Sequence, residues 1–152
     1  MSRDSVQAFL EVYAPDITII DTPVSSATVA EAAAAHGVEP AQIAKTLGLW
    51  LGEEAILIVM SGSARLDNQK YRTQFGQKAR MLNAEDIVER TGHPVGGVCP
   101  FGLPQPLRVF ADLSLQAFPF IIPAAGGVQC ALKIAPQRLV DLAKAEWVDV
   151  AQ

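Results

Sequence analysis

The spacing of apolar residues along the chain predicts a series of short helices. Between Asp4 and Tyr13, the residues Val6, Phe9 and Leu10 recur at three- and four-residue intervals, as on one face of a helix. The other helices are indicated by a capping residue or a proline at the start and a stop signal at the end. One helix is capped by Thr28 and Glu31 and stops at Gly37, and a short one over Ala41–Lys45 follows Pro40. The others are capped by Asp67 and run to Phe75 before Gly76, capped by Asn83 and end at Gly92, and run from Pro136 to Ala143.

Short apolar runs between these helices predict strands. Leu47–Leu51 and Ala55–Met60 flank the turn Gly52-Glu53-Glu54, and this pattern is typical of an antiparallel hairpin. The other candidate strands are shorter, and they are Ile17–Ile20, Ala79–Leu82, Leu107–Phe110, Phe120–Pro123, Gln129–Ile134 and Trp147–Val150. Hairpins mixed with helices, without a repeated strand–helix–strand unit, favour a compact α+β fold with a mixed or barrel-like sheet flanked by helices. Because no linker or repeat interrupts its 152 residues, we expect one domain over residues 1–152.

The composition excludes several broad classes of protein. Half of the residues are apolar, so a folded core is expected rather than disorder. The longest apolar runs, such as Ala55–Met60, are too short to span a membrane, and the first residues lack the apolar core of a signal peptide. We therefore expect a cytoplasmic protein without a membrane partner.

Charge is distributed unevenly along the chain. The net charge of −4 argues against binding nucleic acid through a uniformly basic surface. However, five of the twelve basic residues fall between positions 65 and 80, and these are Arg65, Lys70, Arg72, Lys78 and Arg80. The cluster is either the solvated face of a helix or a local contact for phosphates, and the sequence pattern leaves both open.

The stretch VGGVCPFG, Val95–Gly102, contains too many breakers for a regular element and no charge. A metal site is not expected there, because the chain has only two cysteines and two histidines, without the spacing of a ligand set. Cys99 lacks an evident base, since His93 is separated from it by a proline and two glycines. The remaining interpretation is a pocket wall built from backbone, and tight turns are the simpler alternative. No cofactor is expected.

Lys45 is the other candidate for chemistry. It follows the predicted short helix and precedes the apolar run from Leu47, so its neighbours are apolar. It either completes the end of a helix, or it presents an ammonium group that attracts an anion or polarises a carbonyl. Its position in the sequence does not decide between these roles.

Four segments resemble one family in the same order along the chain: VEPAQIAKTL, LIVMSGSARLDNQKY, ERTGHPVGGVCPFGL and IIPAAGGVQCALKIAP. The chain resembles the YbaK/EbsC family, the stand-alone aminoacyl-tRNA deacylases related to the editing domain of bacterial prolyl-tRNA synthetase. The third segment is the most specific, because the family typically carries TGY.VGG.SP.G there. The resemblance implies hydrolysis, in trans, of the ester that joins a wrong amino acid to tRNA.

The resemblance also implies roles for particular residues. It implies that Lys45 is essential. Because an aminoacyl ester is already activated, we expect the turn Gly96–Gly102, with Gly97 as its catalytic member, to supply backbone N–H donors to the developing oxyanion. The residues implied to form the substrate pocket are Thr46, Gly96, Cys99, Pro100, Phe101, Gly102, Ala124, Ala125 and Gly126. The implied partner is the acceptor end of a mischarged tRNA, which Arg65–Arg80 would contact, and a synthetase is a second candidate partner.

Three departures from the family pattern bear on specificity. Ala124 stands where the cysteinyl-tRNA deacylases have a serine, an apolar residue near Ala131 replaces an acid, and Cys99 replaces the usual serine. The edited amino acid therefore stays open among small ones such as Ala, Cys, Ser or Thr on tRNA(Pro) or a related tRNA. Two alternatives stay open as well, a non-catalytic module that binds aminoacyl-tRNA or a synthetase, and a thiol enzyme that uses Cys99.

Overall fold

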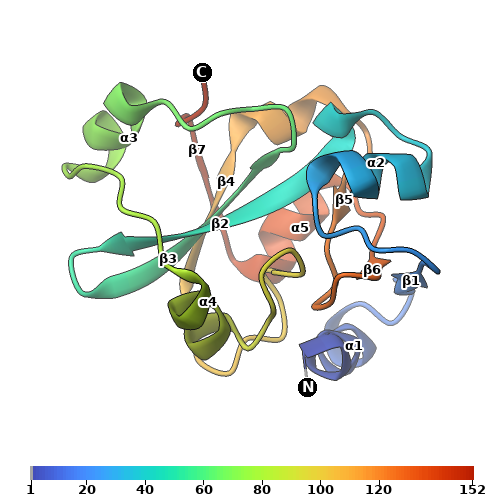
Figure 1. Ribbon diagram of the computed structural model, residues 1–152. Coiled ribbons are helices and arrows are strands. Elements are labelled where there is room, and N and C mark those ends of the chain that lie inside the picture. Colours follow the sequence, from blue (N-terminus) through green and yellow to red (C-terminus); the bar gives the residue numbers. More distant parts are fainter. Residues whose placement is uncertain (1) are drawn as a thin grey trace.

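A five-stranded mixed sheet forms the centre of the computed structural model, which describes residues 2–152 (Figure 1). Its strand order is β5 (Ile122–Pro123), β2 (Ile43–Leu51), β3 (Glu54–Ser61), β4 (Arg108–Asp112) and β7 (Glu146–Val148). Strands β2 and β3 form the predicted antiparallel hairpin, and the other neighbours pair in parallel. The sheet curls into a half-barrel, so the expected α+β class is confirmed.

Helices cover both faces and the ends of this sheet. They are α1 (Ser2–Tyr13), α2 (Val29–His36), α3 (Asn68–Phe75), α4 (Ala84–Thr91) and α5 (Pro136–Ala143), with the 3-10 turns η1 (Pro40–Gln42) and η2 (Leu113–Ala117). Two short strands, β1 (Ile20–Asp21) and β6 (Cys130–Ala131), pair with each other beside α1. No helix within residues 2–152 has the length and apolar character needed to cross a membrane.

Local capping signals determine where the helices begin and end. Thr28 and Glu31 form both hydrogen bonds of the capping box before α2, and Gly37 closes that helix with a φ of 65°. The side chain of Asp67 caps α3 by accepting from the N–H of Lys70, and Asn83 caps α4 in the same way. The predicted helix ends in these segments are confirmed.

The core has two halves because the central strand β3 is buried on both faces. Leu57 and Val59 pack with α1, α5 and the residues around Phe101, whereas Ile56 and Ile58 pack on the opposite face with Tyr71 of α3. Alternate side chains of a strand point to opposite faces, so one apolar run supplies both halves of the core.

Some predicted elements differ from the structure. The helix expected over Ala41–Lys45 is wrong: η1 ends at Gln42, and Lys45 is the third residue of β2. Pairing decides this point, since Ala44 through Leu51 lie opposite Ser61 through Glu54 of β3. The run Ala79–Leu82 forms an isolated bridge from Met81 to Leu49 rather than a full strand.

Candidate active site

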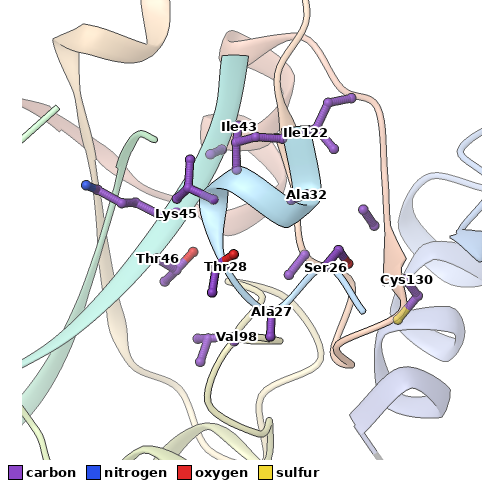
Figure 2. Close-up of a pocket in the computed structure, with 15 residues that line it drawn as sticks. Ser26, Ala27, Thr28, Ala32, Ile43, Lys45, Thr46, Val98, Ile122 and Cys130 are labelled. Atoms are coloured by element: carbon purple, nitrogen blue, oxygen red, sulfur yellow. The ribbon is translucent and has the colours of Figure 1, made fainter. Parts of the chain in front are cut away.

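A cavity of about 190 Å³ opens beside the start of β2. Its walls come from the segment that enters α2, the first residues of β2, strand β5, the loop at Gly96–Val98, and β6. Figure 2 shows Lys45 and Thr46 at one side of this cavity and Cys130 at the other, with the nitrogen end of Lys45 directed away from the other lining residues. The cavity is therefore bordered by Lys45 and Thr46 on one side and by Cys130 on the other.

Among the described residues, no strand pairs with the outer edge of β2 where it passes the cavity. On its outer edge, Ile43 and Ala44 pair with β5, and the main chain of Gly48 and Trp50 bonds to the segment 80–82. The C=O of Gly48 accepts from the N–H of Leu82, and the N–H of Trp50 donates to the C=O of Arg80, so both groups point to this edge. Because outward groups alternate along an antiparallel strand, Thr46 also turns its N–H and C=O to this edge, where no strand of residues 2–152 covers them. A main-chain donor and acceptor thus face the cavity.

The ammonium of Lys45 is held at the edge of the cavity. Its Nζ donates to the carbonyl of Gly62 at 3.3 Å and to that of Ala64, both in the turn after β3. An ammonium has three donors, so one N–H remains for another partner. Burial, followed by the nearby Arg65 cation, lowers the pKa of Lys45 from its ordinary value.

Within residues 2–152, three hydroxyl side chains line the cavity, and one of them has no hydrogen-bond partner. Thr28 Oγ1 caps α2, and Ser26 Oγ donates to the carbonyl of Val128 at 3.0 Å. Thr46 Oγ1 is buried and unpartnered. A buried polar atom without a partner costs about 1–3 kcal/mol, so Thr46 is the hydroxyl with most to gain from a ligand.

The far side of the cavity is apolar. Ala32, Ile43, Ile122 and Ala131 are all buried and line it together with Cys130. Burial raises the pKa of the Cys130 thiol, which therefore behaves as a small apolar group at neutral pH. This side suits a small aliphatic or weakly polar group.

Glycines build the cavity wall by allowing main chains to touch. A Cβ on Gly96, which has a φ of 85°, would lie 2.9 Å from Ala27, and one on Gly97 would lie 2.7 Å from the backbone of Gly127. The N–H of Gly97 donates to the carbonyl of Pro94 at 2.9 Å. That N–H is therefore already engaged, and the expected backbone donor to an oxyanion is not available from Gly97 in this structure.

The second half of the VGGVCPFG stretch turns away from the cavity. A Cβ on Gly102 would lie 2.7 Å from the backbone of Ser5 in α1, and Phe101 stacks on Phe9 of the same helix with ring centroids 5.1 Å apart. Pro100, Phe101 and Gly102 line a separate hollow of about 630 Å³. These three residues lie outside the cavity that contains Lys45.

The loop Ala124–Gly126 is also divided between the cavity and the packing of α1. Ala124 lines the cavity, whereas Ala125 is fully buried. A Cβ on Gly126 would lie 2.6 Å from the carbonyl oxygen of Ser2, so this glycine permits close packing of α1. Of the pocket residues expected from sequence, the cavity gathers Thr46, Gly96 and Ala124 around Lys45.

Cys99 is packed in the core and does not line the cavity. It is 0% exposed, and burial raises its pKa to about 12, so the thiol stays protonated at neutral pH. His93 is also fully buried, with Nε2 2.9 Å from the carbonyl of Phe101, and burial lowers its pKa. These properties argue against a thiol nucleophile at Cys99.

The five clustered basic residues occupy different settings. Lys70 pairs with Asp149 at 3.1 Å, and Arg80 donates to the carbonyl of Gly52. Arg72 and Lys78 line one surface hollow beside α3. Arg65 is exposed and follows Ala64, whose carbonyl receives Lys45. Arg65, Arg72 and Lys78 are therefore better placed for an external anion than Lys70.

Sequence reasoning missed part of the cavity. Ser26, Ala27 and Val29 line it because the capping box at Thr28 starts α2 there, and that box was a usable signal. Cys130 and Ala131 reach it through their pairing with β1, which local pattern does not reveal. Within residues 2–152, no group of three His, Cys, Asp or Glu side chains is arranged to hold a metal ion.

The fold and cavity define a small α+β domain in which a lysine, an unpartnered hydroxyl and open main chain border a small cavity. The model of the aminoacyl-tRNA editing domain family matches residues 24–142. The chain belongs to this family, and it is an aminoacyl-tRNA deacylase. The resemblance found in the sequence is confirmed.

Individual relatives agree with this assignment. The chain is 40% identical over 154 residues to YwhH of Bacillus subtilis (strain 168), an uncharacterized protein, covering 100% of this chain and 98% of YwhH. It is 30% identical over 115 residues to the proline–tRNA ligase of Geobacter sp. (strain M21), covering 75% of this chain and 20% of the ligase. The chain thus spans about a fifth of that ligase.

A solved structure also matches almost completely. The crystal structure of a protein proposed as a trans-editing enzyme for prolyl-tRNA synthetase superposes with a TM-score of 0.92 at 32% identity, covering 99% of this chain and 97% of that chain. The fold is therefore that of this solved relative.

Proposed function

We propose that this protein edits in trans, in the cytoplasm, by hydrolysing the ester of a small amino acid attached to the wrong tRNA. The observation that carries the proposal is the 190 Å³ cavity of an editing-family fold, with Lys45 at one side and apolar walls at the other. The first candidate tRNA is tRNA(Pro), because the family relatives include proline–tRNA ligases and a protein proposed as a trans-editing enzyme for prolyl-tRNA synthetase.

The size of the cavity favours a small aminoacyl group. A cavity of about 150 Å³ in a protein core accommodates benzene, which has six heavy atoms. The present cavity of about 190 Å³ is only slightly larger, so it suits alanyl, cysteinyl, seryl or threonyl groups rather than long or aromatic side chains. The apolar surface of Ala32, Ile122 and Ala131 favours those with the least polar side chain.

The proposed mechanism needs no side-chain nucleophile. An aminoacyl ester is already activated, and a water molecule or the neighbouring ribose hydroxyl can be positioned for attack. The remaining N–H of Lys45 and the main-chain N–H of Thr46 at the open edge of β2 would stabilise the charge that develops on the ester oxygen. Thr46 Oγ1 would hydrogen-bond the aminoacyl group.

The tRNA itself would lie along the basic residues between positions 65 and 80. Arg65 follows the turn that receives Lys45, and the chain then leads into α3 with Arg72 and on to Lys78. This order suits a single-stranded acceptor end near Arg65 and phosphates of the stem beside Arg72 and Lys78. A synthetase partner is compatible with this arrangement and is not required by it.

A panel of purified, labelled aminoacyl-tRNAs tests the proposal. We expect release of the amino acid from one small mischarged pair and no release from prolyl-tRNA(Pro). Tight binding of the same pairs without any release would support the non-catalytic module instead. Release of an aromatic amino acid in preference to small ones would contradict the cavity as the determinant of specificity.

A further inference from the structure

A buried carboxylate lies outside the cavity at the end of β4. Asp112 is 1% exposed and takes part in no salt bridge found within residues 2–152. Its Oδ2 accepts from the N–H of Ser114 at 2.8 Å, and its Oδ1 accepts from the N–H groups of Val150 and Ala151 at 2.8 and 3.1 Å. A buried charge is retained when several such donors satisfy it. The carboxylate therefore joins two separate segments of main chain.

The first of these segments leads to one end of the turn beside Lys45. With its N–H held by Asp112, Ser114 presents its Oγ to the N–H of Ser61 at 3.1 Å. Ser61 in turn donates its hydroxyl to the carbonyl of Ala41 at 2.6 Å. Ser61 is the last residue of β3, so this bond fixes the point at which the turn begins.

The second segment leads to the other end of the same turn. Val150 accepts from the N–H of Asp67 at 2.7 Å, Ala151 forms a bridge with Leu66, and Gln152 donates to the carbonyl of Arg65 at 2.9 Å. Residues 150–152 thus act as a short strand alongside residues 65–67. Asp112 Oδ1 holds this strand by two of its N–H groups.

The turn between the two anchored ends contains both carbonyls that bind the Lys45 ammonium. These belong to Gly62 and Ala64. The turn packs tightly: the N–H of Gly62 donates to Ile43 at 2.6 Å, and a Cβ on Gly62 would lie 2.3 Å from the carbonyl oxygen of Pro40. A shift at either end would move the acceptors of Lys45.

We propose that Asp112 is a positioning residue that fixes the Lys45 ammonium beside the cavity, acting through Ser114 at one end of the turn 61–67 and through residues 150–152 at the other. The consequence for catalysis rests on the proposed function, in which Lys45 acts on the substrate. The positioning of Lys45 itself is a property of the free protein and is measurable without any tRNA.

The test compares Asp112→Asn and Ser114→Ala with the control Asp141→Asn, which alters an exposed carboxylate on α5. Folding of each variant is checked by thermal unfolding. The first readout is the rate at which Lys45 reacts with an amine-selective acylating reagent, followed by peptide mass spectrometry with Lys133 and Lys144 as internal standards. Asp112→Asn should raise the Lys45 rate relative to these lysines by about tenfold, because released carbonyl partners no longer engage the ammonium.

The second readout is single-turnover deacylation of the pair found in the panel. Asp112→Asn should lower the rate constant by about 100-fold, as expected for misplacement of a catalytic group, while the tRNA Kd changes by less than about twofold. Ser114→Ala removes a single acceptor and should lower the rate by about two- to tenfold. If Asp112→Asn does not fold, Ser114→Ala decides the question by the same two readouts.

The outcomes separate the two proposals. A folded variant whose Lys45 reacts at the wild-type rate overturns the positioning role. A raised Lys45 reactivity in a protein that releases no amino acid from any aminoacyl-tRNA supports the positioning role and overturns the proposed function. A fall in activity that comes entirely from weaker tRNA binding also overturns the positioning role.

Discussion

Two hollows, one at each half of the VGGVCPFG stretch, differ in what surrounds them. The cavity beside Lys45 measures about 190 Å³ and combines an ammonium, an unpartnered hydroxyl and the open edge of β2 with apolar walls. The hollow beside Phe101 is larger, about 630 Å³, and its lining is mainly aromatic and aliphatic. Its polar members include Glu54 and Arg108, which pair with each other.

We propose the smaller cavity as the active site because polar groups converge there, not because of its volume. The larger hollow would bury more of a ligand, but two of its charged groups, Glu54 and Arg108, are paired with each other, and Asp141 accepts from Gln137. The smaller cavity keeps uncommitted donors that only a ligand can satisfy, and such groups are what a binding site needs for orientation. The stretch Val95–Gly102 contributes to both, with Gly96 at the cavity and Phe101 at the hollow.

The largest expected difference between the two regions is at their lysines. Lys45→Ala should lower the deacylation rate constant by about 10²–10³, the usual cost of removing one donor to a developing oxyanion. Lys144→Ala, which removes a lysine that lines the hollow, should leave the rate unchanged. Single-turnover kinetics on the same mischarged tRNA measures both. Equal losses, or a near-normal rate for Lys45→Ala, would contradict the assignment of the site.

The glycines sharpen the same comparison. Gly97→Ala and Gly102→Ala would each bring a Cβ to 2.7 Å from another backbone segment. Both variants should lose about 1–3 kcal/mol of unfolding free energy through overpacking, measured by denaturant titration. Only Gly97→Ala, which deforms the cavity wall, should also lower kcat/KM, by about tenfold or more. A comparable loss of kcat/KM in folded Gly102→Ala would place the second half of the stretch in the site after all.

Thr46 offers a test in which stability and activity move in opposite directions. Thr46→Val removes the unpartnered hydroxyl at nearly constant volume. The free energy of unfolding should stay constant or rise by about 1 kcal/mol, because a buried unsatisfied group is removed. The deacylation rate should fall about two- to tenfold through loss of one substrate hydrogen bond. A loss of stability would indicate that Thr46 Oγ1 is satisfied in the free protein.

The smallest effects are expected from single basic residues on the surface. Arg72→Ala and Lys78→Ala should each reduce the slope of log Kd for tRNA against log salt by about 0.7–0.9. Lys70→Ala should change it less, since Lys70 is paired with Asp149. Filter binding over a range of salt concentrations measures these slopes. Unchanged slopes for Arg72→Ala and Lys78→Ala would locate the tRNA elsewhere.

The parts of the structure that could be predicted from sequence depend on neighbouring residues. The capping box of Thr28 and Glu31 and the hairpin around Gly52 are local patterns, and both were found where expected. Lys45 could be chosen as a candidate, but its strand could not be assigned. Its conformation is decided by pairing with β3, which depends on residues more than ten positions away.

The candidate site depends on contacts between distant parts of the sequence even more than the strands do. The family resemblance assigns Gly102 and Gly126 to the substrate pocket, but in the structure both lie against the backbone of α1. Asp112 gave no signal, because its partners Val150 and Ala151 lie 38 and 39 residues further along the chain. The sequence therefore indicates which residues are candidates for the site, but only the folded structure shows which residues they contact.

The most direct test of the central claim is a crystal structure with a non-hydrolysable substrate mimic, such as 3′-alanylamido-3′-deoxyadenosine. The account predicts the alanyl group in the cavity, its methyl group against Ala32 and Ile122, and its amide oxygen within hydrogen-bond distance of Lys45 Nζ or the Thr46 N–H. Binding of the mimic beside Phe101, or in the cavity with Lys45 still turned wholly to Gly62 and Ala64 and no main-chain contact, would contradict it.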